Sequence, residues 1–325
     1  EIAGGPMFYI RHGMGEKWAP MAAFFAGACI LVAFFGIGTF PQVNAIVDSV
    51  NIAFGVPREI SDGVITILVA AITIGGLQSI SHVASRIVPF MAVVYVVISL
   101  GLIFMNISAV PDAIALIVHS AFNGQAAAGG FAGSTLMMAM QKGIARGIFS
   151  NESGLGSAPI AAAAAKTKWP AEQGLISMTG TFIDTIIICS MTGLALVLTG
   201  VWQGNSAGAM MTADAFAFAY GQVGVALLTI SLALFAFTTI LGWNYYGERA
   251  CIYLFGTKGV LPYRFIFIVL VASGAFLKLD AIWTLADIVN GLMAIPNLVA
   301  LCALSGVIVS ETQRYMEYRE NDDQG

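Results

Sequence analysis

The sequence predicts an all-α polytopic membrane protein, and composition is the first reason. Hydrophobic residues make up 58% of the 325 positions and charged residues only 10%, and the mean hydropathy is +0.86. Soluble globular domains carry about 25% charged residues, so a soluble class is excluded. The second reason is that apolar runs of about 20 residues, long enough to cross hydrocarbon, recur along the chain.

Seven apolar segments are predicted to be crossing helices. The first continues past its apolar part to about residue 50, and the second is short for a straight crossing. They are residues 20–40, 63–76, 87–105, 174–201, 223–243, 265–277 and 283–309.

The connections between these segments carry further predictions. Residues 111–122 are expected to form a helix on the outer interface, because proline and aspartate suit its start and its apolar residues have helical spacing. Residues 202–216 are predicted to be an outer loop without basic residues. The charged tail, residues 311–325, is predicted to be disordered and cytoplasmic.

An eighth crossing is predicted at residues 130–166, a polar and glycine-rich stretch. It contains no apolar run of about 20 residues, and Lys142, Arg146 and Glu152 fall in its middle. A discontinuous helix reconciles these facts: two half-helices meet at a joint whose unpaired backbone groups are satisfied by protein or by a water-filled cavity. Such joints build ion and substrate sites in secondary transporters.

Basic residues set the orientation of these crossings. When the loops alternate between sides, ten of the fourteen Lys and Arg fall on one side and only Arg58 and Lys278 on the other, while Lys142 and Arg146 lie in the broken stretch. The positive-inside rule makes the richer side cytoplasmic. The N-terminal loop and the C-terminal tail are therefore both predicted to lie inside.

Other classes of function lack their signals. Outside short loops no basic cluster supports nucleic-acid binding, and GxSxG, HExxH and nucleotide-loop motifs are absent, so no enzyme and no cofactor are expected. The cysteines have no CxxC spacing and are predicted to be buried free thiols: Cys29, Cys189, Cys251 and Cys302. Because the chain starts at Glu1 within a loop-like segment, we expect it to be a piece of a longer protein.

Residues 143–167, GIARGIFSNESGLGSAPIAAAAAKT, resemble the signature of the alanine/glycine:cation symporter family of prokaryotic amino acid carriers. Further similarity lies at GGPMFYI (4–10), FIDT (182–185), GWNYYGERA (242–250) and ADIVNGLMAIPNL (286–298). The resemblance implies a leucine-transporter-like fold with inverted repeats. Core helices 3 to 10 would be present, residues 130–166 as the sixth, with the first two before Glu1. It also implies import of alanine or glycine with sodium across a prokaryotic plasma membrane.

Polar residues at the joint are candidates for substrate binding. Ser150 and Asn151, beside Glu152 and several glycines, offer side-chain oxygens and accessible backbone, and a half-helix N-terminus favours a carboxylate ligand. The alternative is a polar loop whose Asn or Ser caps the second half-helix. Phe149 would form an apolar wall over a small side chain; the alternative is ordinary packing.

Three residues from other segments join the substrate candidates. Gln42 and Asn44 lie on a helix expected beside the broken one, where their amides could hold an amino acid or bond between helices. Trp243 could close the cavity from the cytoplasmic side, together with Phe149, or belong to an interfacial aromatic belt.

The adjacent hydroxyls of Thr238 and Thr239 are candidate sodium ligands. The resemblance implies this role, because in that fold the eighth core helix supplies paired hydroxyls to a sodium ion. The alternative is that each hydroxyl bonds the carbonyl four residues back, as most buried threonines in membrane helices do.

Two carboxylates, Asp184 and Asp287, fall inside apolar segments, where an ionised group is costly and functional by default. Asp184 could neutralise a cation or pair with Lys142 or Arg146. Asp287 is expected near an outer gate with Asn290 as its partner. Structural ion pairing is the alternative for either carboxylate.

Two rival functions stay open at this point. One is a proton-coupled carrier, and the other is a channel, since a broken helix can also line a pore. The unequal segments and the absence of a repeated short pore loop argue against a channel. The sequence leaves open which amino acid and enantiomer is carried, the stoichiometry and the oligomeric state.

Single cysteines at Gly129 and Thr167, in a cysteine-free full-length background, should label from opposite faces of intact cells. The reason is that residues 130–166 are predicted to cross once, with Gly130 outside and Lys166 inside. An impermeant maleimide, applied before and after permeabilisation, measures this. Labelling of both positions from one face would show that the stretch does not cross.

Overall fold

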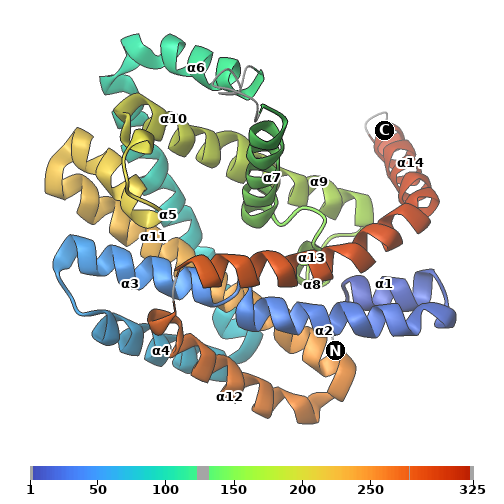
Figure 1. The fold of residues 1–325 in the computed structure, drawn as a ribbon. Helices are drawn as coiled ribbons and strands as arrows, with labels where there is room; N and C mark the ends of the chain where they lie inside the picture. Colours follow the sequence, from blue (N-terminus) through green and yellow to red (C-terminus); the bar gives the residue numbers. More distant parts are fainter. Residues whose placement is uncertain (1–2, 123–131, 278, 323–325) are drawn as a thin grey trace.

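The computed structural model describes residues 3–122, 132–277 and 279–322, and over these residues it is helical and without strands (Figure 1). By length and composition, six segments of the described chain could cross a membrane: Glu16–Phe54, His82–Met105, Pro170–Thr199, Ala209–Phe255, Thr257–Phe276 and Ala281–Ala303. The prediction of an all-α polytopic membrane protein is thus confirmed. The inverted-repeat arrangement of the helices stays a prediction.

The α-helices are α1 (Pro6–Gly13), α2 (Ala19–Phe35), α3 (Phe40–Phe54), α4 (Arg58–Ile74), α5 (Gly76–Met105), α6 (Val110–Phe122), α7 (Ala132–Asn151), α8 (Ala158–Ala162), α9 (Pro170–Phe182), α10 (Ser190–Thr199), α11 (Ala209–Phe255), α12 (Val260–Val271), α13 (Leu279–Ala303) and α14 (Ser305–Asp322). A π-helical turn, Ile183–Cys189, joins α9 to α10. The predicted helix at residues 111–122 corresponds to α6.

The first predicted crossing is interrupted, which the sequence did not indicate to us. Helix α2 ends at Phe35 and α3 begins at Phe40. The hydroxyl of buried Thr39 donates to the carbonyl oxygen of Ala33 at 2.5 Å, so a backbone acceptor at the end of α2 is satisfied. At Gly38 an added Cβ would lie 2.7 Å from the Cβ of Trp243. The interruption therefore lets α11 approach the backbone of the first crossing.

Two other predicted boundaries are wrong. Helix α5 begins at Gly76, ahead of the predicted residue 87, and α11 begins at Ala209, inside the predicted outer loop. The start of α11 is helical because Phe216 and its neighbouring alanines are buried in a small apolar cluster with Tyr95. Non-helical backbone at Gly221 (φ 59°) separates this part from the rest of α11.

The tail is not disordered where the structure describes it, since α14 continues to Asp322. This helix packs against α9, and the buried ring of Tyr315 lies 6.2 Å from the ring of Trp169. The prediction of disorder rested on the charge of the tail. It is wrong because the aromatic residues of the tail give the helix a surface that it can bury.

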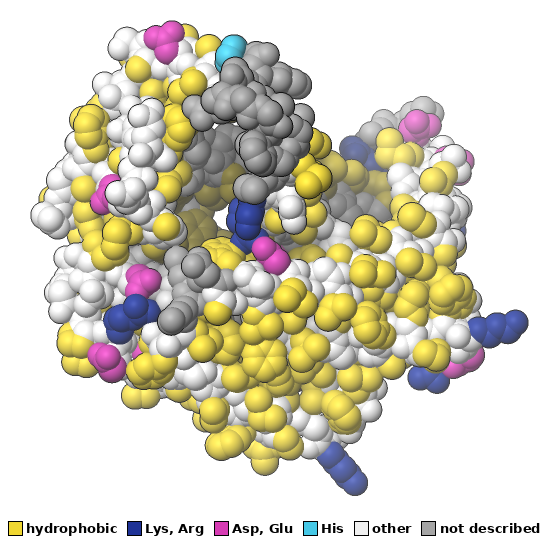
Figure 2. Space-filling model, viewed as in Figure 1, with side chains coloured by type: hydrophobic (Ala, Val, Ile, Leu, Met, Phe, Trp, Pro, Cys, Tyr) yellow, Lys and Arg dark blue, Asp and Glu magenta, His cyan; other side chains and the backbone are white. Residues whose placement is uncertain are grey.

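One cysteine contradicts the prediction of buried thiols. All four are free; Cys29 and Cys251 are buried and Cys189 is partly buried, but Cys302 on α13 is exposed. An apolar sequence context cannot distinguish a site inside the protein from one that faces lipid, because both environments are apolar. Figure 2 shows a surface on which hydrophobic side chains predominate and charged ones are few.

Most of the core lies where α1, α2, α3, α11, α12 and α13 pack together, with Phe25, Ile240 and Phe267 fully buried. Leu155 and Ile160, from the stretch around α8, belong to the same core. In Figure 1, α7 is drawn in front of the place where α9 and α10 meet, and it packs against the π-helical turn there. The core therefore holds one end of the broken stretch, and α7 extends from it.

Replacing Gly38 by alanine should lower the thermal midpoint of the purified full-length protein. The new methyl group meets the Cβ of Trp243 and the Ala33 carbonyl oxygen, both at 2.7 Å, and such overpacking costs about 1–3 kcal/mol. Gly27→Ala on α2 is the control, because nothing lies within 4 Å of its added Cβ and helix propensity then favours alanine. An equal midpoint shift for both variants would contradict the close approach at Gly38.

Candidate functional site

The joint is the segment between α7 and α8, residues 152–157. Helix α7 ends at Asn151, and α8 is a short helix that begins at Ala158. The second half-helix is thus much shorter than residues 130–166 suggested, because the chain leaves α-helical geometry after Ala162. Residues 129–131 lie outside the described residues, and the crossing itself stays a prediction.

Backbone conformation at the joint requires special residues. Glu152 has φ 56°, and Gly154 and Gly156 have φ 81° and 89°. A Cβ at Gly156 would meet Pro6 of α1 at 2.6 Å and Asn297 of α13 at 2.9 Å. Gly156 is therefore required for two reasons: its φ is positive, and α1 and α13 both come too close for a side chain.

Asn297 is the residue that fixes this backbone, and we did not predict it. Its side-chain nitrogen donates to the carbonyl oxygen of Gly154 at 2.8 Å, and its oxygen accepts a hydrogen bond from the hydroxyl of Tyr9. Asn297 is 2% exposed, so an unmatched amide here would be costly. A lone asparagine after Pro296 in an apolar helix was the available signal.

The carboxylate of Glu152 points into the protein and holds two donors. Trp243 Nε1 donates to Oε1 at 2.8 Å, and the Ser157 hydroxyl donates to Oε2 at 2.5 Å. Trp243 is 1% exposed, so it is not part of an interfacial belt. Since the same residue packs against Gly38, Trp243 lies between the interruption of the first crossing and the joint.

Ser150 and Asn151 face the π-helical turn. The Ser150 hydroxyl donates to Asp184 Oδ2 at 2.7 Å, and Asn151 Nδ2 donates to the Thr185 hydroxyl at 3.0 Å. Thr185 in turn lies 3.3 Å from Asp184 Oδ2. Such turns recur at functional sites. The structure thus gathers a carboxylate, two hydroxyls and an amide beside the joint.

Neither Ser150 nor Asn151 caps the second half-helix. Asn151 Oδ1 accepts from the backbone N–H of Ser153 at 2.9 Å, which turns the chain at the end of α7. The residue before α8 is Ser157, and its hydroxyl bonds Glu152 instead of capping that helix. The predicted capping alternative is therefore wrong.

Arg146 pairs with Asp287, so the expected partnership of Asp287 with Asn290 is wrong. The guanidinium carbon of Arg146 lies 5.1 Å from the centre of the Phe149 ring and 4.4 Å from that of Trp283. The two rings are 4.8 Å apart. These contacts join α7 to α13 beside a cavity of about 240 Å³ that Phe149, Asp287 and Asn290 help to line.

Phe149 and Trp243 do not enclose one pocket. Phe149 packs with Trp283 and lines the cavity between α7 and α13, whereas Trp243 contacts Glu152, Gly38 and the ring of Tyr246. A wall made of these two rings, as the sequence suggested, is therefore not formed.

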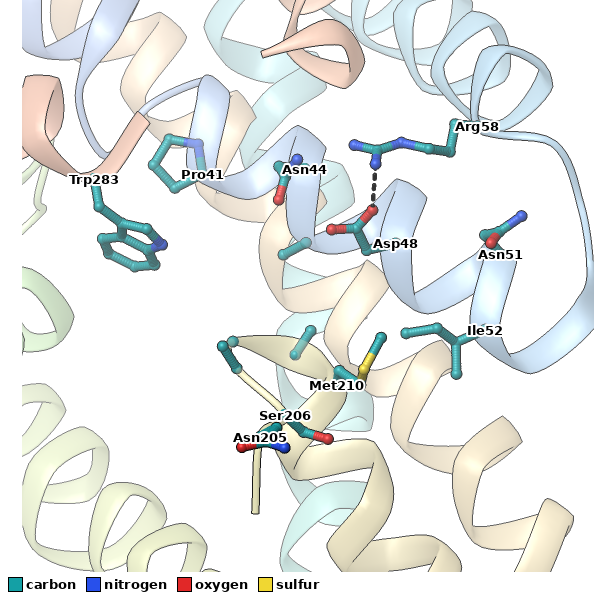
Figure 3. Close-up of a pocket in the computed structure, with 14 residues that line it drawn as sticks. Pro41, Asn44, Asp48, Asn51, Ile52, Arg58, Asn205, Ser206, Met210 and Trp283 are labelled. Atoms are coloured by element: carbon teal, nitrogen blue, oxygen red, sulfur yellow. Dashed lines mark ion pairs between the residues drawn. The ribbon is translucent and has the colours of Figure 1, made fainter. Parts of the chain in front are cut away.

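Asn44 belongs to a separate ionic cluster. Arg58 and Asp48 form an ion pair at 3.0 Å, and the buried amide of Asn44, oriented to match donors with acceptors, bonds Asp48 at 3.1 Å and Arg58 at 3.0 Å. Figure 3 shows the three side chains together along a cavity of about 470 Å³ that Trp283 also lines. This matches the interhelical alternative for Asn44. Gln42 is half-buried on the same helix and does not line this cavity.

The hydroxyls of Thr238 and Thr239 bond their own helix. Thr238 donates to the carbonyl oxygens of Leu234 at 3.1 Å and Phe235 at 2.9 Å, and Thr239 donates to that of Phe235 at 3.0 Å. Both hydroxyl protons are donated to backbone carbonyls of the same helix, which is the alternative given for these residues above. The lone pairs of the hydroxyl oxygens stay available to a cation.

Comparison with known proteins gives one consistent result. The family model "Sodium:alanine symporter family" matches residues 1–325. The sequence is 57% identical to an uncharacterized transporter of Haemophilus influenzae over 97% of this chain and 69% of that protein. It is 45% identical to the sodium/alanine symporter AgcS of Methanococcus maripaludis (99% and 71%) and 35% identical to the probable sodium/glutamine symporter GlnT of Bacillus subtilis (98% and 65%).

Trp243→Phe should destabilise the full-length protein although it keeps an aromatic ring. The change leaves the buried Oε1 of Glu152 without its donor, which costs about 1–3 kcal/mol. Glu152→Gln in the Trp243→Phe background should recover part of the loss, because a neutral amide is cheaper to leave unpaired than a charge. Thermal unfolding measures this, with Trp202→Phe at an exposed position as control. A midpoint unchanged by Trp243→Phe would rule out the contribution of this bond.

Proposed function

Because the chain belongs to the sodium:alanine symporter family, we propose that the complete carrier is a secondary active symporter that imports alanine or glycine together with sodium. Two features of the proposal go beyond the family: the small neutral substrate and the direction of transport. The proposal includes a prokaryotic plasma membrane, in keeping with the organisms of the relatives, and a cytoplasmic C-terminus, which the distribution of basic residues favours. A leucine-transporter-like core is part of the same proposal.

The observation that carries the proposal is the contact between the end of α7 and the π-helical turn. Asp184 lies in a segment apolar enough to cross, and its carboxylate has hydroxyl partners and, within the described chain, no cationic one. An ionised carboxylate at membrane depth needs compensation. A hard cation such as sodium prefers oxygen ligands, and Asp184, Ser150 and Thr185 offer three of them.

We infer that this cluster is the better-supported sodium site of the two candidates. It supplies a full negative charge, whereas Thr238 and Thr239 offer only neutral hydroxyl oxygens that already donate to carbonyls. The threonine pair remains a second candidate. It would bind a second coupling ion, because one carrier can hold a sodium ion at each of the two sets of oxygens.

The substrate is expected to bind against the joint. Side-chain and backbone polar groups of Ser150 and Asn151 lie at the end of α7, and half-helix ends bind the charged groups of an amino acid without a full counter-charge. Phe149 bounds the neighbouring cavity of about 240 Å³, which has room for a small amino acid. One relative is named a sodium/alanine symporter and another a probable sodium/glutamine symporter, so alanine or glycine is our proposal for this carrier.

Proton coupling is the second candidate, because Asp184 is a carboxyl group beside the joint. Both mechanisms need this carboxylate, but they differ in what drives uptake. A channel is the third candidate function. In a channel, unlabelled substrate inside the vesicle does not accelerate the uptake of labelled substrate from outside.

Purified full-length carrier in proteoliposomes should take up labelled alanine when sodium is inwardly directed, and internal unlabelled alanine should accelerate labelled uptake. A proton gradient alone should not drive it. Asp184→Asn should raise the sodium concentration for half-maximal uptake by roughly tenfold, the equivalent of losing about 1.4 kcal/mol of ion binding. Asp214→Asn is the matched control, since that carboxylate bonds Ser206 outside the joint.

The outcomes separate the candidates. Uptake driven by a proton gradient without sodium would replace sodium by protons as the coupling ion. Absence of counterflow would favour a channel. An unchanged sodium dependence in Asp184→Asn would remove this cluster from the ion site.

A further inference from the structure

A pocket at one end of the molecule has no part in the proposed transport site. We call it the tail pocket: it measures about 420 Å³ and lies between the loop that precedes α9 and the C-terminal helix α14. Its lining combines cationic and aromatic side chains from these two segments: Lys166, Lys168, Arg319, Trp169, Tyr315 and Tyr318.

Aromatic contacts hold the two walls of the tail pocket together. The Trp169 ring lies 5.2 Å from that of Tyr318 and 6.2 Å from that of Tyr315. Tyr315 is buried at 8% exposure, whereas Tyr318 is exposed. Helix α14 also packs against α9, and Figure 1 shows it turning away from α13 and running past the beginning of α9. The pocket is therefore a defined site between packed helices.

The cations of the tail pocket are not neutralised by the protein. Across the described residues, no ion pair forms at Lys166, Lys168 or Arg319, and Glu172 is the pocket's single acidic residue. Arg314, on the same helix as Arg319, does pair with Glu311 at 2.7 Å. The pocket thus carries an excess positive charge that an anion would balance.

The position of the tail pocket along the chain indicates which class of anion it binds. Helix α9 opens a segment apolar enough to cross a membrane, Pro170–Thr199, and α14 follows another, Ala281–Ala303, with only Leu304 between α13 and α14. Because α14 packs on α9, the pocket lies at the start of the segment Pro170–Thr199, and α14 reaches it from the end of the other segment. Tryptophan and tyrosine beside such ends are typical of the headgroup level of a bilayer.

We propose that the tail pocket binds the phosphate headgroup of an anionic phospholipid. Lys166, Lys168 and Arg319 would contact the phosphodiester oxygens through charge-assisted hydrogen bonds, and the rings of Trp169 and Tyr318 lie at the depth of the glycerol and upper acyl chain. A phospholipid is favoured over a free phosphate because the site lies where the segment Pro170–Thr199 begins and is lined by three aromatic rings. This inference does not depend on the transported substrate.

Quenching of Trp169 fluorescence by brominated lipids tests the proposal in full-length carrier in mixed micelles. The Trp169 signal is the emission difference between a protein and the same protein with Trp169→Phe. Brominated phosphatidylglycerol should half-quench it at a roughly tenfold lower mole fraction than brominated phosphatidylcholine. In Lys166→Gln/Lys168→Gln/Arg319→Gln the two lipids should become equivalent. The charge-matched control Arg11→Gln/Lys17→Gln/Arg314→Gln should keep the preference.

Two further arms keep the test decisive. Lys166→Arg/Lys168→Arg/Arg319→Lys preserves charge and should retain the preference, so a loss in the glutamine variant would follow from the lost charge and not from replacing these three side chains as such. Millimolar glycerol 3-phosphate should leave the preference unchanged. Equal quenching by both lipids in the parent, an unchanged preference in the glutamine variant, or abolition of the preference by glycerol 3-phosphate would each overturn the proposal, the last in favour of a soluble phosphate.

Discussion

Breaking a helix inside an apolar environment leaves backbone N–H and C=O groups that water cannot reach, and each one left unpaired costs about 1–3 kcal/mol. This molecule has such a break between α2 and α3 and another at the joint. Side chains solve the problem in both places: Thr39 bonds the carbonyl of Ala33, and Asn297 bonds that of Gly154. Trp243 packs against the first break and donates to Glu152 in the second, so the two are tied together.

The pairing of charges follows from the same constraint. Asp48 with Arg58, and Asp287 with Arg146, are matched within the protein. Asp184 bonds only hydroxyl groups among the described residues. An ionised carboxylate at membrane depth needs compensation, which is why we propose a cation at this position, where the π-helical turn meets the end of α7.

The cations of the tail pocket, unpaired among the described residues, lie outside the apolar segments, near the ends of helices. They lie beside the start of α9 and on α14, and three aromatic rings share the lining of this pocket with them. The helix α14 owes its order to that packing. A charged tail can therefore become part of the folded structure when aromatic residues at helical spacing give it a surface to bury.

The sequence alone predicted the helical membrane class, the family and the location of the joint. The length and composition of apolar runs depend directly on the thickness of the hydrocarbon core, and a polar interruption in such a run is easy to recognise. The break at Gly36 to Thr39, the exposure of Cys302 and the partners of Asp287, Trp243 and Asn44 came only with the tertiary structure. Glycines in an apolar run do not say whether the helix continues, and pairing depends on which helices become neighbours. Residues far apart in the chain, such as Asn297 and Gly154, meet only through that packing.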